Sequence, residues 1–161
     1  MEHWSLEKLL SAQEHKGELY SYQIVAILLA LENLAGLNDC GIKLYHSWIS
    51  SRKKREPYQS TVNLALLARS FEINGFSEKF PLEVDSVDNL LNGGTHRTAC
   101  SIFYDLKHVP VTFRRRTGPT KDKPKYYGID YFSKSELFNT EDIEIMLSRW
   151  SLIRKKYGLI K

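Results

Sequence analysis

The sequence has 161 residues, which is the length of one ordinary domain. Hydrophobic residues make up 42% and charged residues 26%, so there is enough apolar material for a core, and disorder as the main state is excluded. The longest aliphatic stretch, residues 24–31, is far shorter than the ~20 residues that cross a bilayer. The first residues contain no secretory signal pattern, so we expect a cytoplasmic protein with no membrane partner.

Basic residues account for the net charge of +4 and gather in three runs. The run at 154–156 suits the end of a helix, where cations offset the helix dipole. The runs at 52–55 and 114–116, the second followed by lysines up to residue 125, fit either a solvated face or a phosphate-bearing partner.

Neither the cysteines nor the histidines predict a metal site. Cys40 and Cys100 belong to no C-x-x-C pair, so we expect reduced thiols, with Cys100 buried. The five histidines show no metal-ligand spacing, and His46, which lies between Tyr45 and Trp48, is expected to be a packed side chain.

Apolar residues at a spacing of three and four predict helices in chain order over residues 6–15, 18–34 and 61–73. The second of these is apolar on most of its circumference, so we expect it to be buried on nearly all sides. A last helix is predicted with Glu141 in its first turn and Gly158 after its end.

Between these helices the sequence predicts three short extended segments. Residues 80–84 are expected to form an edge or first strand and residues 89–92 a second one. Residues 108–113 predict a third strand, which Pro110 should place at an edge or start late. The composition of residues 114–125 favours a mobile loop.

These elements predict a single α+β domain over residues 1–161, with a small mixed sheet surrounded by helices. We expect a helical extension over residues 1–50, a core over 60–116, and a basic loop and C-terminal helix over 117–161.

Residues 90–106 carry the candidate chemistry, in the order strand, tight turn and helix. We expect Thr95 to cap this helix, whose first backbone N–H groups would then bind an anion. Gly93 and Gly94 would let the main chain approach a phosphate closely. Arg97 would add a forked charged contact, and His96 a second donor or a proton relay. The alternative is an ordinary capped helix, with His96 in solvent and Arg97 in a surface salt bridge.

The segment Asn92-Gly-Gly-Thr-His-Arg-Thr-Ala99 resembles the D-G-x-H-R-x-x-A signature of the ParB/sulfiredoxin-like superfamily. It follows Phe80-Pro-Leu-Glu-Val84 and precedes Lys107-His-Val-Pro-Val111, an order that is similar to the superfamily's strand, helix and strand. The helix predicted just before the first strand ends in Asn74-Gly-Phe76, and this ending is similar to that in a small bacterial branch of the superfamily. The resemblance covers roughly residues 60–113.

The resemblance implies a nucleotide site for ATP (or CTP), with Mg²⁺ as a candidate cofactor. It places phosphate contacts at Asn92, Gly93, Gly94, Thr95, His96 and Arg97. Thr95 stands where sulfiredoxins carry a reactive cysteine, which argues against sulfinic-acid reduction. Asn92 replaces the usual aspartate, which keeps a turn-forming hydrogen bond but removes a charge.

The leading functional hypothesis is an ATP-dependent phosphotransferase that acts on a small hydroxylated metabolite or sugar. Phosphoryl transfer needs a base or orienting group beside the acceptor hydroxyl. Beside His96, the candidates are Glu83, Asp85 and Asp88 just ahead of the turn and Glu72 at the end of the preceding helix, and the alternative for each is a solvated surface acid. Asp85 is favoured as a magnesium or base residue because it directly follows a strand. The basic runs at 52–55 and 114–116 could close over the phosphates, and residues 117–125 could form a lid.

Two other functions stay open. The basic runs and the DNA-linked members of the superfamily suggest a DNA-binding or nuclease module. Asn92 in place of an aspartate suggests a catalytically inactive regulator that senses a nucleotide.

Overall fold

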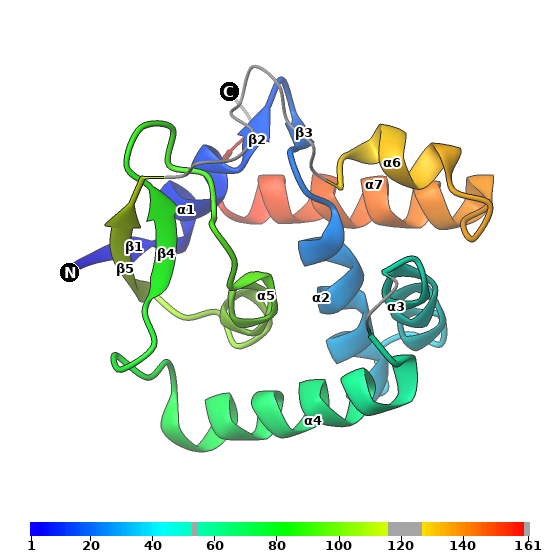
Figure 1. Ribbon diagram of the computed structural model, residues 1–161, viewed down its shortest axis with the longest axis horizontal. Coiled ribbons are helices and arrows are strands. Elements are labelled where there is room, and N and C mark those ends of the chain that lie inside the picture. The colour runs from blue at the N-terminus through cyan, green and yellow to red at the C-terminus, as the bar shows by residue number, and fades with distance from the viewer. Residues whose placement is uncertain (53–54, 116–126, 160–161) are drawn as a thin grey trace.

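The computed structural model describes residues 1–52, 55–115 and 127–159, and its architecture is α+β (Figure 1). The described elements, in chain order, are β1 (Glu2–Ser5), α1 (Leu6–Ala12), β2 (Glu14–His15), β3 (Glu18–Leu19), α2 (Gln23–Leu34), α3 (Gly41–Ser50), α4 (Pro57–Asn74), β4 (Leu82–Asp85), α5 (Thr95–Phe103), β5 (His108–Arg114), α6 (Ile129–Lys134) and α7 (Thr140–Lys156).

The mixed sheet has the strand order β1-β5-β4, with β1 antiparallel and β4 parallel to the central strand β5. The prediction of an edge strand is therefore confirmed for β4. For β5 the edge prediction was wrong, because this strand lies in the centre of the sheet. The parallel pairing begins with Leu82 opposite Val111, one residue beyond Pro110. Pro110 has no backbone N–H to donate. It can lie in a central strand because the ladder with β4 starts only at the next residue, Val111.

The N-terminal segment differs from the two predicted helices. The first helix ends at Ala12, and a short hairpin of β2 and β3 turns at Lys16 and Gly17, whose φ angles are +51° and +84°. The second helix begins only at Gln23. Gln13 ends the first helix because its side chain donates to the Leu9 carbonyl and accepts the Leu91 N–H.

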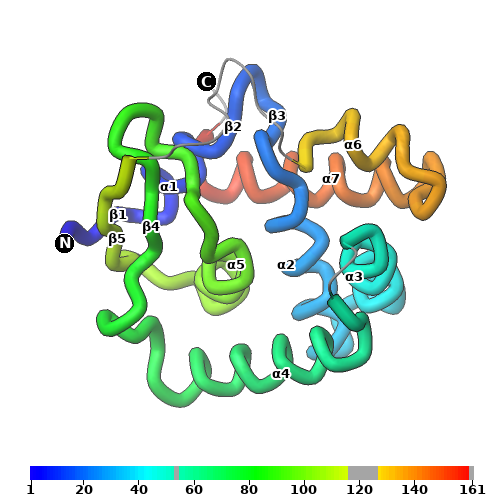
Figure 2. Tube along the Cα trace, viewed as in Figure 1, coloured from blue at the N-terminus to red at the C-terminus, as the bar shows by residue number. Residues whose placement is uncertain are grey.

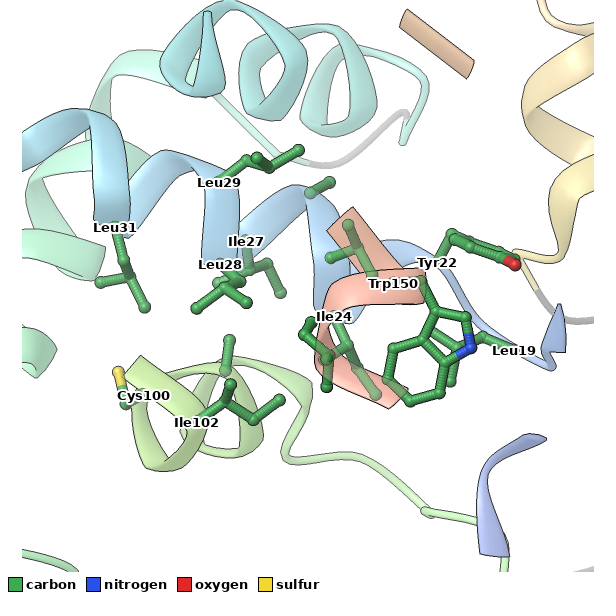
Figure 3. Packing of buried hydrophobic residues seen from close by; sticks show 14 of the residues in the cluster. Leu19, Tyr22, Ile24, Ile27, Leu28, Leu29, Leu31, Cys100, Ile102 and Trp150 are labelled. Atoms are coloured by element: carbon green, nitrogen blue, oxygen red, sulfur yellow. The ribbon is translucent and has the colours of Figure 1, made fainter. Parts of the chain in front are cut away.

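Helix α2 lies at the centre of the fold, and the prediction that it is buried on nearly all sides is confirmed. Its residues from Ile24 to Leu31 are all buried, between α3 on one side and α5 on the other (Figure 1). Figure 3 shows Ile27 and Leu28 directed toward Ile102 of α5, and Trp150 of α7 beside Ile24. Cys100 is buried, as expected.

Helix α3 was not predicted, although its side chains Tyr45 and Trp48 contact His96 and Arg52 of the site described below. Leu44, Tyr45, Trp48 and Ile49 form its buried face. At Gly41 a Cβ atom would lie 1.9 Å from the Leu29 carbonyl oxygen, so only glycine permits this close approach to α2. The connection from α3 leads to α4, which begins at Pro57 rather than at the predicted residue 61.

The other elements follow the sequence more closely. Helix α7 begins with a capping box in which the Asn139 and Asp142 side chains accept each other's backbone N–H groups.

The strand predicted over 89–92 was wrong: only a single bridge joins Leu91 to Val84, because Asn89 has a φ of +63°. The predicted loop over 114–125 lies largely outside the described residues. Along the described parts of the chain, no helix has the length and apolar character needed to span a membrane.

Candidate functional site

The candidate site is built on the turn that joins β4 to α5, which Figure 2 traces. After β4 the chain folds back on itself, with the Asp85 N–H bonded to the Leu90 carbonyl and the Asn92 N–H to the Glu83 carbonyl. The expectation that Thr95 caps α5 was wrong. Gly94, in the left-handed conformation at φ +79°, is the N-cap, and Thr95 is the first helical residue. The cap has no side chain, so it leaves the N–H groups of the first turn without a side-chain acceptor.

The two glycines of this turn have different roles. At Gly94 a Cβ atom would lie 2.7 Å from Leu82 Cδ2 and 3.3 Å from Arg97 Nη2. At Gly93 a Cβ atom would meet nothing within 4 Å, and this residue borders two cavities. A side chain at position 94 would therefore displace the Leu82 side chain, whereas Gly93 leaves the main chain accessible.

The first cavity, which we call the arginine cavity, has a volume of about 440 Å³. Arg52 and Arg55 reach it from the connection between α3 and α4, and Arg97 reaches it from α5. The fold thus brings the ends of the basic run 52–55 to the glycine turn. The residues that line the cavity are Gln23, Arg52, Arg55, Leu67, Gly93, Gly94, Thr95, His96, Arg97 and Tyr127.

Aromatic rings and backbone carbonyls hold two of these arginines. The Arg52 guanidinium lies 5.3 Å from the Trp48 ring centroid and 5.6 Å from that of Tyr127. These distances fit cation–π contacts. Arg97 Nη1 donates to the carbonyls of Phe80 and Pro81. Both guanidinium groups are consequently positioned before any ligand binds.

His96 is a largely buried, neutral side chain rather than a solvated one. Its Nε2 lies 2.9 Å from the Tyr45 hydroxyl, and its ring packs against the Trp48 ring. Burial, assisted by the charges of Arg55 and Arg52, lowers the pKa of His96 to about 4. The imidazole is therefore uncharged near neutral pH, and its proposed role as a proton relay stays a prediction.

The second cavity, which we call the adjoining cavity, has a volume of about 400 Å³ and shares Gln23, Gly93, Thr95 and Tyr127 with the arginine cavity. It combines apolar, hydroxyl, amide and charged groups. Its lining residues are Gln13, Tyr20, Ser21, Gln23, Ile24, Glu83, Leu90, Leu91, Asn92, Gly93, Thr95, Arg114, Arg115 and Tyr127.

The three acidic and amide candidates occupy different places. Glu83 lines the adjoining cavity, and its Oε1 lies 3.9 Å from Arg114 Nη1. Asn92 also lines it and donates from Nδ2 to the Arg114 carbonyl at 3.2 Å. Asp85 is buried, accepts the Asp88 N–H at 3.3 Å, and is not among the described residues that line either cavity.

Sequence reasoning did not find several residues that line the cavities. Gln13, Ser21 and Gln23 come from the N-terminal segment, and Tyr127 follows the basic loop. Gln13 is a buried polar residue that directly follows the apolar face of α1. A polar residue in such a position is the local signal that could have drawn attention to it. Within the described ranges there is no group of three or more His, Cys, Asp or Glu side chains that could hold a metal ion.

Comparisons of the chain with family models, with curated proteins and with solved structures find no significant match. The resemblance to the ParB/sulfiredoxin-like superfamily consequently remains a prediction from the residues of the turn.

Proposed function

We propose that this protein binds a nucleoside triphosphate, ATP or CTP, through its phosphate groups in the arginine cavity. The observation that carries the proposal is the convergence of Arg52, Arg55 and Arg97 on the N-terminus of α5. Guanidinium groups and free N–H groups at a helix N-terminus are both well suited to bind phosphate. Gly93 leaves space for the phosphates to approach the main chain.

The adjoining cavity supports the same proposal. Its volume of about 400 Å³ lies in the usual range for small-molecule sites, and it meets the arginine cavity at Gly93 and Thr95. A phosphate group at this turn would therefore reach a second ligand. We propose that the turn belongs to a ParB/sulfiredoxin-like core, which agrees with its position between the parallel strands β4 and β5.

The proposed activity is phosphoryl transfer to a small hydroxylated metabolite or sugar. The acceptor oxygen forms a bond to the γ-phosphorus, the bond from that phosphorus to the bridging oxygen breaks, and the nucleoside diphosphate leaves. Glu83 is the carboxylate that lines the adjoining cavity, so it is the group that would accept or orient the hydroxyl proton. Mg²⁺ would be held mainly by the phosphates and would offset their charge.

The position of Asp85 favours one alternative, a nucleotide-sensing regulator without catalysis. The Asp85 carboxylate accepts a backbone N–H within its own turn. Asn92 places an amide, which carries no charge and cannot act as a base, at the position where a carboxylate could serve phosphoryl transfer. Such a protein would bind the nucleotide in the same cavity but would leave its terminal phosphate unchanged.

Calorimetric titration with ATP, CTP and GTP, with and without Mg²⁺, tests nucleotide binding. The proposal expects saturable binding of at least one triphosphate, and a weaker affinity in Arg97→Gln. Arg69→Gln, which changes an exposed arginine of α4 outside both cavities, should bind as tightly as the unchanged protein. Absence of saturable binding at millimolar nucleotide refutes the proposal.

Phosphorus NMR with a panel of sugars and amino alcohols then separates a kinase from a sensor. The kinase proposal expects a new phosphate ester and the nucleoside diphosphate in equal amounts, and Glu83→Gln should lower the rate. A sensor binds the triphosphate without forming either product, and Asn92→Asp restores none. If the arginine cavity instead binds DNA, the affinity for a duplex should fall steeply with salt.

A further inference from the structure

The adjoining cavity contains polar atoms that the fold itself leaves unpaired. Asn92 Oδ1 and Ser21 Oγ are buried and have no hydrogen-bond partner among the described residues. Buried polar atoms are rarely left in this state, because losing water without gaining a partner is unfavourable. Both residues line the cavity, so a ligand there could supply the missing partners.

The orientation of Asn92 defines which ligand group it requires. Its Nδ2 donates to the Arg114 carbonyl, so Oδ1 is left as an acceptor for a donor on the ligand. The Ser21 hydroxyl can both donate and accept. Gln13 lines the same cavity but is fully engaged with the chain, through contacts to the Leu9 and Asn89 carbonyls and the Leu91 N–H. The unpaired groups therefore fit ligand hydroxyls.

Charges at the cavity define a second requirement. Glu83 faces Arg114 across 3.9 Å, and both side chains are accessible to water, so each offsets the other only weakly. Arg115 also lines the cavity and is exposed, and it has no acidic partner within the described part of the chain. The described lining carries two cations against one anion, which favours a ligand with negative charge.

We propose that the adjoining cavity binds the acceptor of the reaction, and that this acceptor is a small hydroxylated compound with its own carboxylate or phosphate group. The inference rests on the proposed function of the arginine cavity. Ligand hydroxyls lie against Asn92 and Ser21, the anionic group lies against Arg115, and the carbon skeleton contacts Ile24 and Leu90. A neutral sugar would leave Arg115 without a partner.

Calorimetry with matched ligands tests the proposal. The probes are ribose and glucose, their terminal phosphate esters and their aldonic acids, each titrated with and without a non-hydrolysable ATP analogue. At least one charged probe should bind about tenfold more tightly than its neutral parent. Comparing the ester with the acid shows which anionic group is preferred, and inorganic phosphate alone should bind more weakly than the ester.

Three variants locate the binding. Arg115→Gln should remove the advantage of the charged probe over its neutral parent, whereas Arg69→Gln should keep it. Ser21→Ala should weaken the charged and the neutral probe by similar factors. Arg69 and Arg115 are exposed, and Ser21→Ala removes only a hydroxyl that has no partner among the described residues, so circular dichroism should show an unchanged fold.

The outcomes for the two proposals are distinguishable. The inference is overturned if no charged probe binds saturably at millimolar concentration or if the neutral parents bind equally well. It is also overturned if Arg115→Gln weakens nucleotide binding and charged-probe binding by the same factor, because this cation would then serve the nucleotide. If the unchanged protein binds no nucleotide, the proposed function of the arginine cavity is refuted. The titrations of the charged and neutral probes without nucleotide would still test the adjoining cavity.

Discussion

Replacing Gly94 with alanine tests whether the turn has the close packing described above, and Gly36 provides a matched control. The two glycines have nearly identical φ angles, +79° and +78°. A left-handed alanine costs roughly 1–2 kcal/mol at either position. At Gly36 a Cβ atom meets nothing within 4 Å, whereas at Gly94 it would lie 2.7 Å from Leu82 Cδ2. Overpacking of this kind adds roughly 1–3 kcal/mol.

We therefore expect Gly94→Ala to lower the free energy of unfolding by about 1–3 kcal/mol more than Gly36→Ala does. Any gain from a stiffer unfolded chain is similar for the two changes and cancels in the difference. Urea unfolding followed by tryptophan fluorescence is a suitable assay, because Trp4, Trp48 and Trp150 are all buried. Equal losses in the two variants, at unchanged dependence on urea, would refute the packing of Gly94 against Leu82.

The remaining predictions concern the arginine cavity. Arg52→Gln should weaken ATP binding by about 10- to 100-fold, the usual value of ~1.5–3 kcal/mol for a hydrogen bond to a charged group, as measured by calorimetry. Tyr127→Leu should weaken binding several-fold because the ring holds Arg52, but it should have no further effect when Arg52 is already glutamine, and Tyr127→Phe should bind normally. The pKa of His96 is lowered from 6.5 to about 4, mainly by burial and further by Arg55 and Arg52. Since the unfolded chain binds more protons in this range, the free energy of unfolding should fall as the pH drops from 6.5 through about 4, and the fall should be smaller in His96→Gln. Urea titrations at several pH values measure this, and an identical fall in the variant would contradict the buried, neutral imidazole.

Local patterns predicted the elements whose signals lie close together in the chain. The all-round apolar character of α2 and the capping and charge signals of α7 required no knowledge of distant residues. The glycine turn before α5 was found in the same way, although the cap proved to be Gly94 rather than Thr95. Gly94 can be the cap because it is glycine, which adopts the left-handed conformation without strain.

Long-range contacts define what the sequence could not indicate. Strand β1 is too short to recognise by alternation, and it forms because β5 offers it an antiparallel partner. Gln13 contacts the Asn89 carbonyl and the Leu91 N–H, more than seventy residues away. Tyr127 and Arg52 meet only in the folded chain. The glycine turn could therefore be predicted as a candidate site, whereas the walls of its two cavities could not.

The most direct test of the central claim is an NMR titration of the isotope-labelled protein with ATP, compared with adenosine. The account predicts saturable shifts of the backbone amides of Gly94, Thr95, His96 and Arg97 on addition of ATP, and much smaller shifts with adenosine, because the phosphates make the contact. The account would be contradicted if the chemical shifts of these four amides stayed unchanged at millimolar ATP, whether or not amides elsewhere in the chain shifted.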